Sequence, residues 1–350
     1  MHRYVRPAPP LPRPRRPRQR GAAIVTALLV VTLAVVLVSG LLWRQQVQIR
    51  SIENQRLRAQ ADWIFSAALD YARLVLRDDL RRTAVDHAGE VWAVPIAETR
   101  LSDFLGASLR TDTAGETSFI AGRIIDAESR FNLTNLVNLI TVNGVTRSAG
   151  PNADAIAAYR RLLALLNLNP DLADITAQHL QAALGASPAG PAQAPAAAPS
   201  PRAHPVRDLD DLLAIPGYDP ASVARLAPFA IVLPQRSTQN ANTASAEVMS
   251  ALLEGLTLPA ARTLVAQRTR AHYNSLADLQ NQLRAAAPEL PARSLAAFDV
   301  RSSHFLVYGQ VRHERAERVR EALVYRNAAN VPEVTRVLWI RPVQGLPPTS

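Results

Sequence analysis

The sequence predicts an α+β protein in which a long N-terminal helix packs on an antiparallel sheet and a large α-helical segment is inserted between the strands. Three observations predict this class. Residues 22–43 are apolar and uncharged, and residues 44–80 continue without proline or glycine. From residue 302 onward, apolar residues alternate with a period of two, as in antiparallel strands. Between these regions, residues 151–300 show helix caps and helical spacing.

A basic arm precedes the apolar run. Residues 1–20 hold seven arginines, six prolines and no acidic residue, so the arm forms neither a helix nor a core. As a helix with a rise of ~1.5 Å per residue, residues 22–43 reach roughly 33 Å, enough to cross a hydrocarbon core of about 30 Å. The positive-inside rule places the arm in the cytoplasm and the bulk of the chain across the membrane.

Three interpretations of this N-terminus remain open. A cleavable secretory signal has a short apolar stretch before a polar mature start, whereas Ser39 and Gly40 precede further apolar residues here. An ordinary N-terminal anchor needs only the hydropathy. The third interpretation is a type III leader, because Gly21 lies at the junction between the basic arm and the apolar helix. That junction resembles the leaders of type IV pilins and of type II secretion pseudopilins.

The resemblance to pseudopilins implies how the N-terminus is processed. A prepilin peptidase would cut between Gly21 and Ala22, remove residues 1–21 as a leader, and leave Ala22 to be N-methylated. The fifth mature residue is then Thr26, where most pilins have glutamate. A carboxylate in the bilayer is costly unless it is paired, so a subunit without a neighbour above it could dispense with it. In lacking this glutamate, the chain resembles the large K-type minor pseudopilins.

Composition narrows the functional classes. The formal charge is +10, and the seven leader arginines account for all but +3 of it. The basic character is therefore mainly a topology signal rather than a nucleic-acid signal. The chain has no cysteine, and it has no nucleotide-binding glycine loop, no G-x-S-x-G motif and no H-E-x-x-H motif. We expect a structural and interaction protein rather than an enzyme.

The apolar run is predicted to continue as one amphipathic helix that leaves the membrane and docks on a sheet, with two separate helices as the alternative. Its expected buried stripe follows three- and four-residue steps. The stripe consists of Leu57, Ala61, Ile64, Ala68, Tyr71 and Val75. The short runs 90–96 and 118–126 predict strands, and three further strands are predicted within residues 305–340.

A turn rich in acidic and amide side chains follows residue 126. Such side chains bond to their own backbone and set turns. Residues 130–136, RFNLTNL, closely resemble the RFNLNNL signature of K-type pseudopilins, so we expect a fold-defining turn rather than a catalytic site. The signature positions present are Arg130, Phe131, Asn132, Leu133, Asn135 and Leu136.

The helical segment contains two parts that resemble helix-hairpin-helix modules. Asn152 and Asp171 are predicted helix caps, and an Ala/Pro-rich loop follows at 185–206. DNA-binding hairpins present backbone N–H groups to phosphate from a Gly-apolar-Gly turn. Pro259 stands in that turn and has no N–H group, which favours a structural insertion without nucleic acid. The alternative function is a membrane-anchored DNA-binding protein of competence type.

Two acidic groups are candidate Ca²⁺ ligands, because carboxylate oxygens are the ligands that Ca²⁺ prefers. The first group is Asp126 with Glu128, and the second is Asp208, Asp210 and Asp211. For the second group, stabilisation of a helix N-terminus is the competing explanation. Neither group has the EF-hand spacing, so the metal assignment stays open, and no other cofactor is expected.

The resemblance to K-type minor pseudopilins covers nearly the whole mature chain and implies its organisation. The expected parts are the leader 1–21, a transmembrane helix 22–43, a pilin-like domain at 44–150 completed by a β-meander at 301–341, and an inserted helix-hairpin-helix or SAM-like domain at 151–300. The chain would sit in the inner membrane with its N-terminus in the cytoplasm and its bulk in the periplasm.

The same resemblance implies a role and partners. The protein would start or cap a periplasmic pseudopilus that helps export folded proteins across the outer membrane. Implied partners are other minor pseudopilins of the I, J and H types, the major pseudopilin, the prepilin peptidase and inner-membrane lipid. Exported substrate and the outer-membrane secretin are further candidates.

Overall fold

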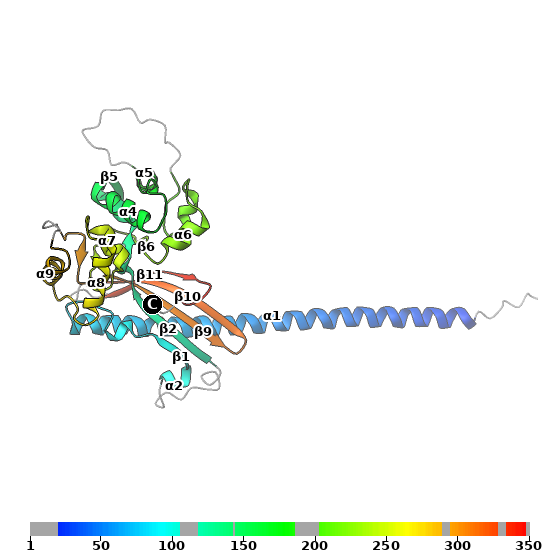
Figure 1. The fold of residues 1–350 in the computed structure, drawn as a ribbon. Helices are drawn as coiled ribbons and strands as arrows, with labels where there is room; N and C mark the ends of the chain where they lie inside the picture. The colour runs from blue at the N-terminus through cyan, green and yellow to red at the C-terminus, as the bar shows by residue number, and fades with distance from the viewer. Residues whose placement is uncertain are drawn as a thin grey trace, which may run out of the picture. The chain divides into compact units, whose positions relative to one another are not determined.

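The structure, a computed structural model, describes residues 20–105, 118–142, 144–185, 203–288, 295–327 and 334–347. Most of the predicted leader and of the predicted loop 185–206 lies outside these ranges. The chain divides into two compact units, residues 1–57 and 58–350, which are described separately. Helix α1 (Arg20–Arg82) contributes to both (Figure 1).

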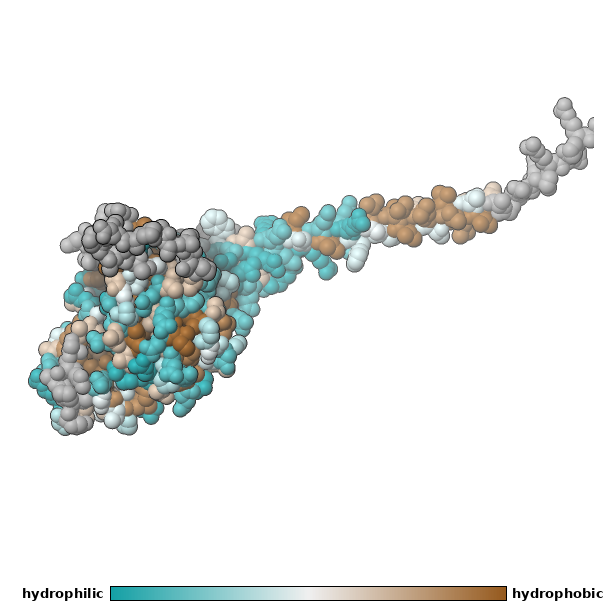
Figure 2. Space-filling view, turned by 90° about the horizontal axis from the view of Figure 1, so that it is seen from above, coloured by the Kyte–Doolittle hydropathy of each residue, from teal (hydrophilic) through white to brown (hydrophobic). Residues whose placement is uncertain are grey.

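The first unit contains the apolar part of α1. Large apolar side chains from Ile24 to Trp43 are 54–70% exposed, and in Figure 2 this part of the helix is mostly brown. Exposed leucine and valine on all sides of a helix are unfavourable in water and favourable in lipid. Among the described residues, one helix is long and apolar enough to cross a membrane, and it contains this segment.

The second unit is built on a five-stranded antiparallel sheet with the strand order β1-β2-β9-β10-β11. The strands are β1 (Ile96–Arg100), β2 (Ser118–Asp126), β9 (His304–His313), β10 (Ala316–Arg326) and β11 (Thr335–Pro342). The three predicted C-terminal strands are confirmed. The predicted strand at 90–96 is wrong: a 3-10 helix (Val91–Ala93) occupies it, and the strand begins at Ile96.

Residues 58–82 of α1 pack on one face of this sheet, around a core that includes Trp92, Ile120 and Phe305. The predicted stripe is correct at Leu57 and Ala61, which are buried, and in part at Ile64 and Val75, which are partly buried against the core. It is wrong at Tyr71, which is 46% exposed. The buried positions instead follow mainly four-residue steps at Phe65, Leu69, Ala72 and Leu76. The larger side chains face the sheet, so the true stripe is rotated from the predicted one.

A glycine brings the helix and the sheet into close contact. A Cβ atom on Gly309 of β9 would lie 2.8 Å from Cε2 of Phe65 on α1, which is closer than van der Waals contact allows. Because glycine has no Cβ, the Phe65 ring can pack directly on the β9 backbone. This contact helps to fix how residues 58–82 lie on the sheet.

The chain leaves the sheet after β2 and returns at β9, although these two strands are neighbours in the sheet. The segment between them contains short strands and six described α-helices, which can be followed by their labels in Figure 1. The helices are α4 (Ala153–Leu165), α5 (Leu172–Leu184), α6 (Pro220–Leu226), α7 (Ala246–Leu252), α8 (Leu258–Arg268) and α9 (Leu276–Ala286). Helices α6 and α7 are the shortest of these. The helices predicted in this region are therefore confirmed.

Two hydrophobic cores organise this segment. One surrounds Phe131, Tyr159 and Leu212, and the other surrounds Met249, Leu264 and Tyr273. Short strands close them: β3 (Phe131–Asn132) pairs with β6 (Ala230–Ile231), β4 (Val137–Val142) with β5 (Val145–Pro151), and β7 (Gln239–Asn240) with β8 (Phe298–Asp299).

The predicted caps are correct in part. The side chain of Asn152 accepts a hydrogen bond from the Ala155 N–H at the start of α4. Asp171 occupies the cap position of α5, but its side chain makes no capping hydrogen bond.

Candidate functional site

The predicted signature turn lies between the sheet and the helical segment. Asn132 joins it to residues 233–237: its Oδ1 accepts from the Thr134 N–H (3.1 Å) and the Leu233 N–H (3.2 Å). Its Nδ2 donates to the Gln235 carbonyl at 2.8 Å. Asn135 exchanges two hydrogen bonds with the backbone of Ser237. These amide side chains therefore hold two chain segments together, in addition to setting a local turn.

The apolar positions of the signature are buried. Phe131, Leu133 and Leu136 are each no more than 1% exposed, and the Phe131 ring stacks on the Tyr159 ring of α4 at 5.4 Å between centroids. This arrangement explains the spacing of the motif: apolar residues face the core while the asparagines bond to the neighbouring segment.

We expect replacement of Asn132 by alanine to lower the free energy of unfolding by about 2–4 kcal/mol, because the buried Thr134 and Leu233 N–H groups lose their acceptor. The matched control is Asn138→Ala, whose side-chain hydrogen bonds are exposed and whose loss should cost under about 1 kcal/mol. Denaturant unfolding measures both. Equal losses in the two variants would contradict the assignment.

Asp126 stands at the centre of a buried polar junction, which we define as Asp86, Asp126, Glu128, Asn240, Ser302, His304 and Arg326. Its Oδ2 accepts from Asn240 Nδ2 (3.0 Å), Thr243 Oγ1 (2.5 Å) and Ser302 Oγ (2.6 Å). Its Oδ1 accepts from the Glu128 N–H at 2.8 Å. Burial, aided by the charge of Glu128, raises the pKa of Asp126 to about 7 despite these donors.

Glu128 extends the polar junction to β9. Its Oε1 lies 2.7 Å from Nδ1 of His304, and its Oε2 accepts from the Ser303 N–H at 3.1 Å. Both side chains of this pair are almost fully buried. Asp126 and Glu128, which the sequence predicted together, do lie together, but they bond to donors of the chain itself.

A second acidic group was not predicted. Asp79, Asp86 and Glu90 bring carboxylate oxygens within 4.8 Å of one another. Arg326 at the end of β10 donates to Asp79 at 2.8 Å and also to Asp86. Glu90 accepts from the indole N–H of Trp92 at 2.7 Å. No sequence spacing relates residues 79–90 to Arg326; the packing of α1 and the following segment against the sheet brings them together.

These buried carboxylates do not fit a Ca²⁺ site well. Ca²⁺ takes six to eight oxygen ligands that are free to face the ion. In the polar junction and the group around Asp79, the carboxylates already face an arginine, a histidine, hydroxyls or N–H groups. The geometry therefore accounts for them as internal acceptors.

The acidic group at 208–211 lies at the start of a 3-10 helix (Asp210–Ala214). Oδ1 of Asp208 accepts from the N–H groups of Asp210 and Asp211, and Oδ2 of Asp211 accepts from the Arg207 N–H. Asp208 also lies 3.4 Å from Arg341. This pattern is that of a helix N-terminus. Ca²⁺ binding there stays a prediction, and a calcium titration followed by isothermal calorimetry would test it.

The second hairpin-like segment, around Leu256 to Pro259, lacks the geometry of a phosphate site. Thr257 caps α8 by accepting from the Ala260 N–H at 3.4 Å, and Leu256 beside it is buried. Pro259 lies in the first turn of α8. The turn that would face DNA therefore carries a buried leucine and a proline, and no described feature there favours the DNA-binding alternative.

The predicted processing site falls within α1. Gly21 and Ala22 are helical, and residues 1–19 lie outside the described ranges. The Thr26 hydroxyl donates to the Ala23 carbonyl of its own helix at 3.0 Å. A hydroxyl bonded in this way can enter lipid without a partner from another chain, whereas a carboxylate cannot.

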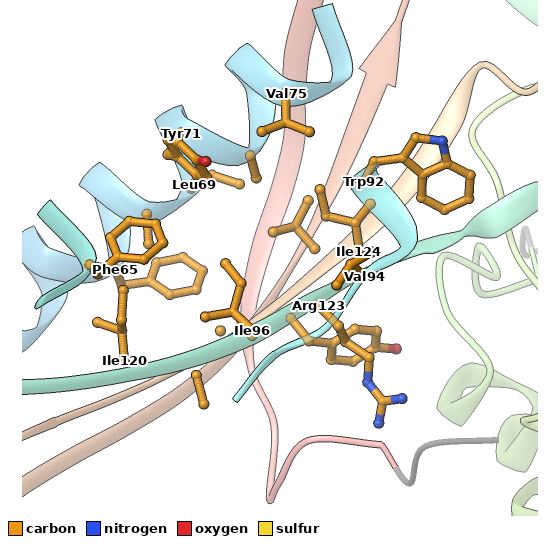
Figure 3. A pocket seen from close by; sticks show the side chains of 18 of the residues that line it. Phe65, Leu69, Tyr71, Val75, Trp92, Val94, Ile96, Ile120, Arg123 and Ile124 are labelled. Carbon is orange, nitrogen blue, oxygen red and sulfur yellow. The ribbon is translucent and has the colours of Figure 1, made fainter. Parts of the chain in front are cut away.

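An apolar cavity of about 250 Å³ lies between α1, the 3-10 helix 91–93 and the sheet (Figure 3). Phe65, Leu69 and Val75 line it from α1, and Ile120 lines it from β2. Val91 and Val94 at its edge are 78% and 63% exposed. The lining is mostly apolar, with Arg123 among its polar members, so this cavity suits contact with an apolar surface rather than chemistry.

The described part of the chain thus combines a membrane-length helix, an antiparallel sheet and polar sites devoted to joining segments. Two family models described as type II secretion system protein K match residues 129–235 and 240–301. The type II secretion system protein K of Pseudomonas aeruginosa is 34% identical over 281 residues, covering 76% of this chain and 77% of that protein. The protein K of Pectobacterium carotovorum is 28% identical and covers 92% and 97%.

A solved structure, the GspK-GspI-GspJ complex from the type 2 secretion system of enterotoxigenic Escherichia coli, contains a chain of similar fold. The TM-score is 0.61 at 19% identity, covering 84% of this chain and 99% of that one. The chain belongs to the type II secretion system protein K family. Its members are minor pseudopilins, structural components of the secretion system.

Proposed function

We propose that this minor pseudopilin starts or caps a periplasmic pseudopilus, rather than repeating along it. In this proposal residues 44–150 and 301–341 form a pilin-like domain, and a helix-hairpin-helix or SAM-like domain is inserted at 151–300. The observation that carries it is the long excursion of the chain between neighbouring strands β2 and β9. A segment of that size permits neighbours below but leaves little room for one above.

The N-terminus supports the same position. Thr26 needs no partner in lipid, because its hydroxyl is bonded within its own helix. A subunit that is never followed by another loses nothing by lacking the usual glutamate. We propose that the leader is cut between Gly21 and Ala22, that Ala22 is methylated, and that the protein crosses the inner membrane once with its bulk in the periplasm.

The partners follow from the proposed position. The related complex contains GspI and GspJ, so we propose the I- and J-type minor pseudopilins as direct partners. The H-type subunit, the major pseudopilin, the prepilin peptidase and inner-membrane lipid complete the set, and exported substrate and the secretin lie next to the tip. No catalytic step and no nucleic acid form part of this role.

Copy number tests the proposal. In pseudopili isolated with the full chain, we expect a single copy per filament, located at one end by labelling. A second variant replaces residues 127–304 with a two-residue Asn-Gly turn, which can join Asp126 to its cross-strand partner Phe305. If this variant folds, it should occur at several positions along the filament. Full-length protein distributed along the filament would overturn the tip assignment.

A further inference from the structure

A row of polar contacts joins residues 58–82 of α1 to the strands of the sheet. Each contact pairs a helix residue with a strand residue that is more than 240 positions away in sequence. The pairs are Gln60 with His313 (3.2 Å), Asp62 with Arg320 (2.7 Å), Arg73 with the Thr335 carbonyl (2.8 Å) and Asp79 with Arg326 (2.8 Å). They reach three different strands, β9, β10 and β11.

Arg326 is a deeply buried member of the row. Its side chain is 3% exposed, and it donates to Asp79, to Asp86 and to the carbonyl groups of Leu76 and Ser302. Its guanidinium also lies over the Phe305 ring, 4.5 Å from the centroid. One side chain at the end of β10 therefore holds both the last turns of α1 and the loop that follows them.

Equilibrium stability alone does not account for such an arrangement. A buried ion pair adds little stability over apolar residues of the same volume, because desolvation offsets the attraction. The resistance of α1 to sliding along the sheet depends on a different property of these contacts. Apolar side chains can slip from one neighbour to the next, whereas a hydrogen bond is lost once its atoms separate by about an ångström beyond their normal distance.

We infer that this row of contacts, with Arg326 at its end, is a force-bearing clamp that keeps α1 on the sheet when the helix is pulled along its axis. The inference rests on the proposed function, because assembly of a membrane-anchored subunit into a periplasmic pseudopilus would pull on the apolar part of α1. A pull on that part passes through the continuous helix into residues 58–82, where the four contacts are loaded together.

The test is forced unfolding of the full chain in detergent micelles. The chain has no native cysteine, so two introduced cysteines define the points of attachment. Arg58→Cys with Gln344→Cys pulls α1 against the sheet, and Asp154→Cys with Gln344→Cys pulls a different axis. At a fixed force on the first axis, we expect Arg326→Met to detach α1 at least roughly tenfold faster than the parent, since hydrogen bonds to charged groups contribute about that factor each.

Two comparisons separate a clamp from general weakening. Leu306→Ala removes a buried side chain from the other face of the sheet. At matched equilibrium stability, α1 should detach faster in Arg326→Met than in Leu306→Ala when the α1 axis is pulled. On the control axis the two variants should not differ in this way. Arg73→Met, whose side chain is partly exposed, should accelerate detachment with little change in equilibrium stability, whereas Arg312→Met, which loses a surface pair with Glu98, should not.

If the detachment rates follow equilibrium stability alone, in every variant and on both axes, the clamp inference is wrong. The pulling experiment does not depend on secretion. A clamp that behaves as expected, in a chain that is found along the whole pseudopilus, would leave the clamp in place and overturn the proposed tip position.

Discussion

Replacement of Arg326 by alanine lowers the free energy of unfolding by about 3–5 kcal/mol, the usual loss when one partner of a buried ion pair is removed. Asp86 is 3% exposed and would lose the guanidinium that faces it. Asp79 would lose the same partner. The loss should therefore exceed that of any single exposed ion pair in the chain.

Denaturant unfolding followed by circular dichroism measures this loss. Arg312→Ala is the matched control, because Arg312 pairs with Glu98 where both side chains are about half exposed. Exposed pairs contribute at most about 1 kcal/mol. A loss in Arg326→Ala no larger than in Arg312→Ala would mean that Arg326 does not hold the end of α1.

The second large effect is a pH dependence at Asp126. Burial raises its pKa from 3.8 to about 7 in the folded protein, so between these values the folded state binds more protons than the unfolded state. The contribution of Asp126 to stability is therefore fully present below pH 4 and is lost as the pH rises to about 7. A difference of about three pKa units corresponds to about 4 kcal/mol.

Asp126→Asn isolates this contribution, because asparagine keeps the shape and carries no charge. The free energy of unfolding of the variant, minus that of the parent protein, should increase by about 4 kcal/mol between pH 4 and pH 8. Asn132→Ala, which removes no titratable group, should give a difference independent of pH. A flat difference for Asp126→Asn would show that its carboxylate stays ionised in the fold.

Much of the fold could be predicted because its signals are local. The charge-free run before Trp43, the period of two in β9 and β10, and the cap at Asn152 each depend on neighbouring residues. The turn at 130–136 could also be located, although its pairing with residues 233–237 could not. Helix period alone did not fix which residues of α1 face the sheet, because several apolar stripes were compatible with the pattern.

The sequence predicted only part of the polar junction. Asp126 and Glu128 are close in the chain, with Ala127 between them, but Asn240, Ser302 and His304 contact them across more than 110 residues of sequence. Arg326 gave no signal at all, since one arginine on a strand looks the same whether it faces water or two aspartates. Burial, which decides whether these groups are ligands or internal acceptors, follows from the tertiary structure.

The measurement that tests the account most directly is the N-terminal mass of the protein extracted from membranes, with and without a co-expressed prepilin peptidase. We expect a methylated N-terminus at Ala22 that appears only with the peptidase. An intact Met1 in both samples would contradict it and leave a plain membrane anchor. An N-terminus beyond Trp43 would indicate a secreted protein and would contradict the filament role altogether.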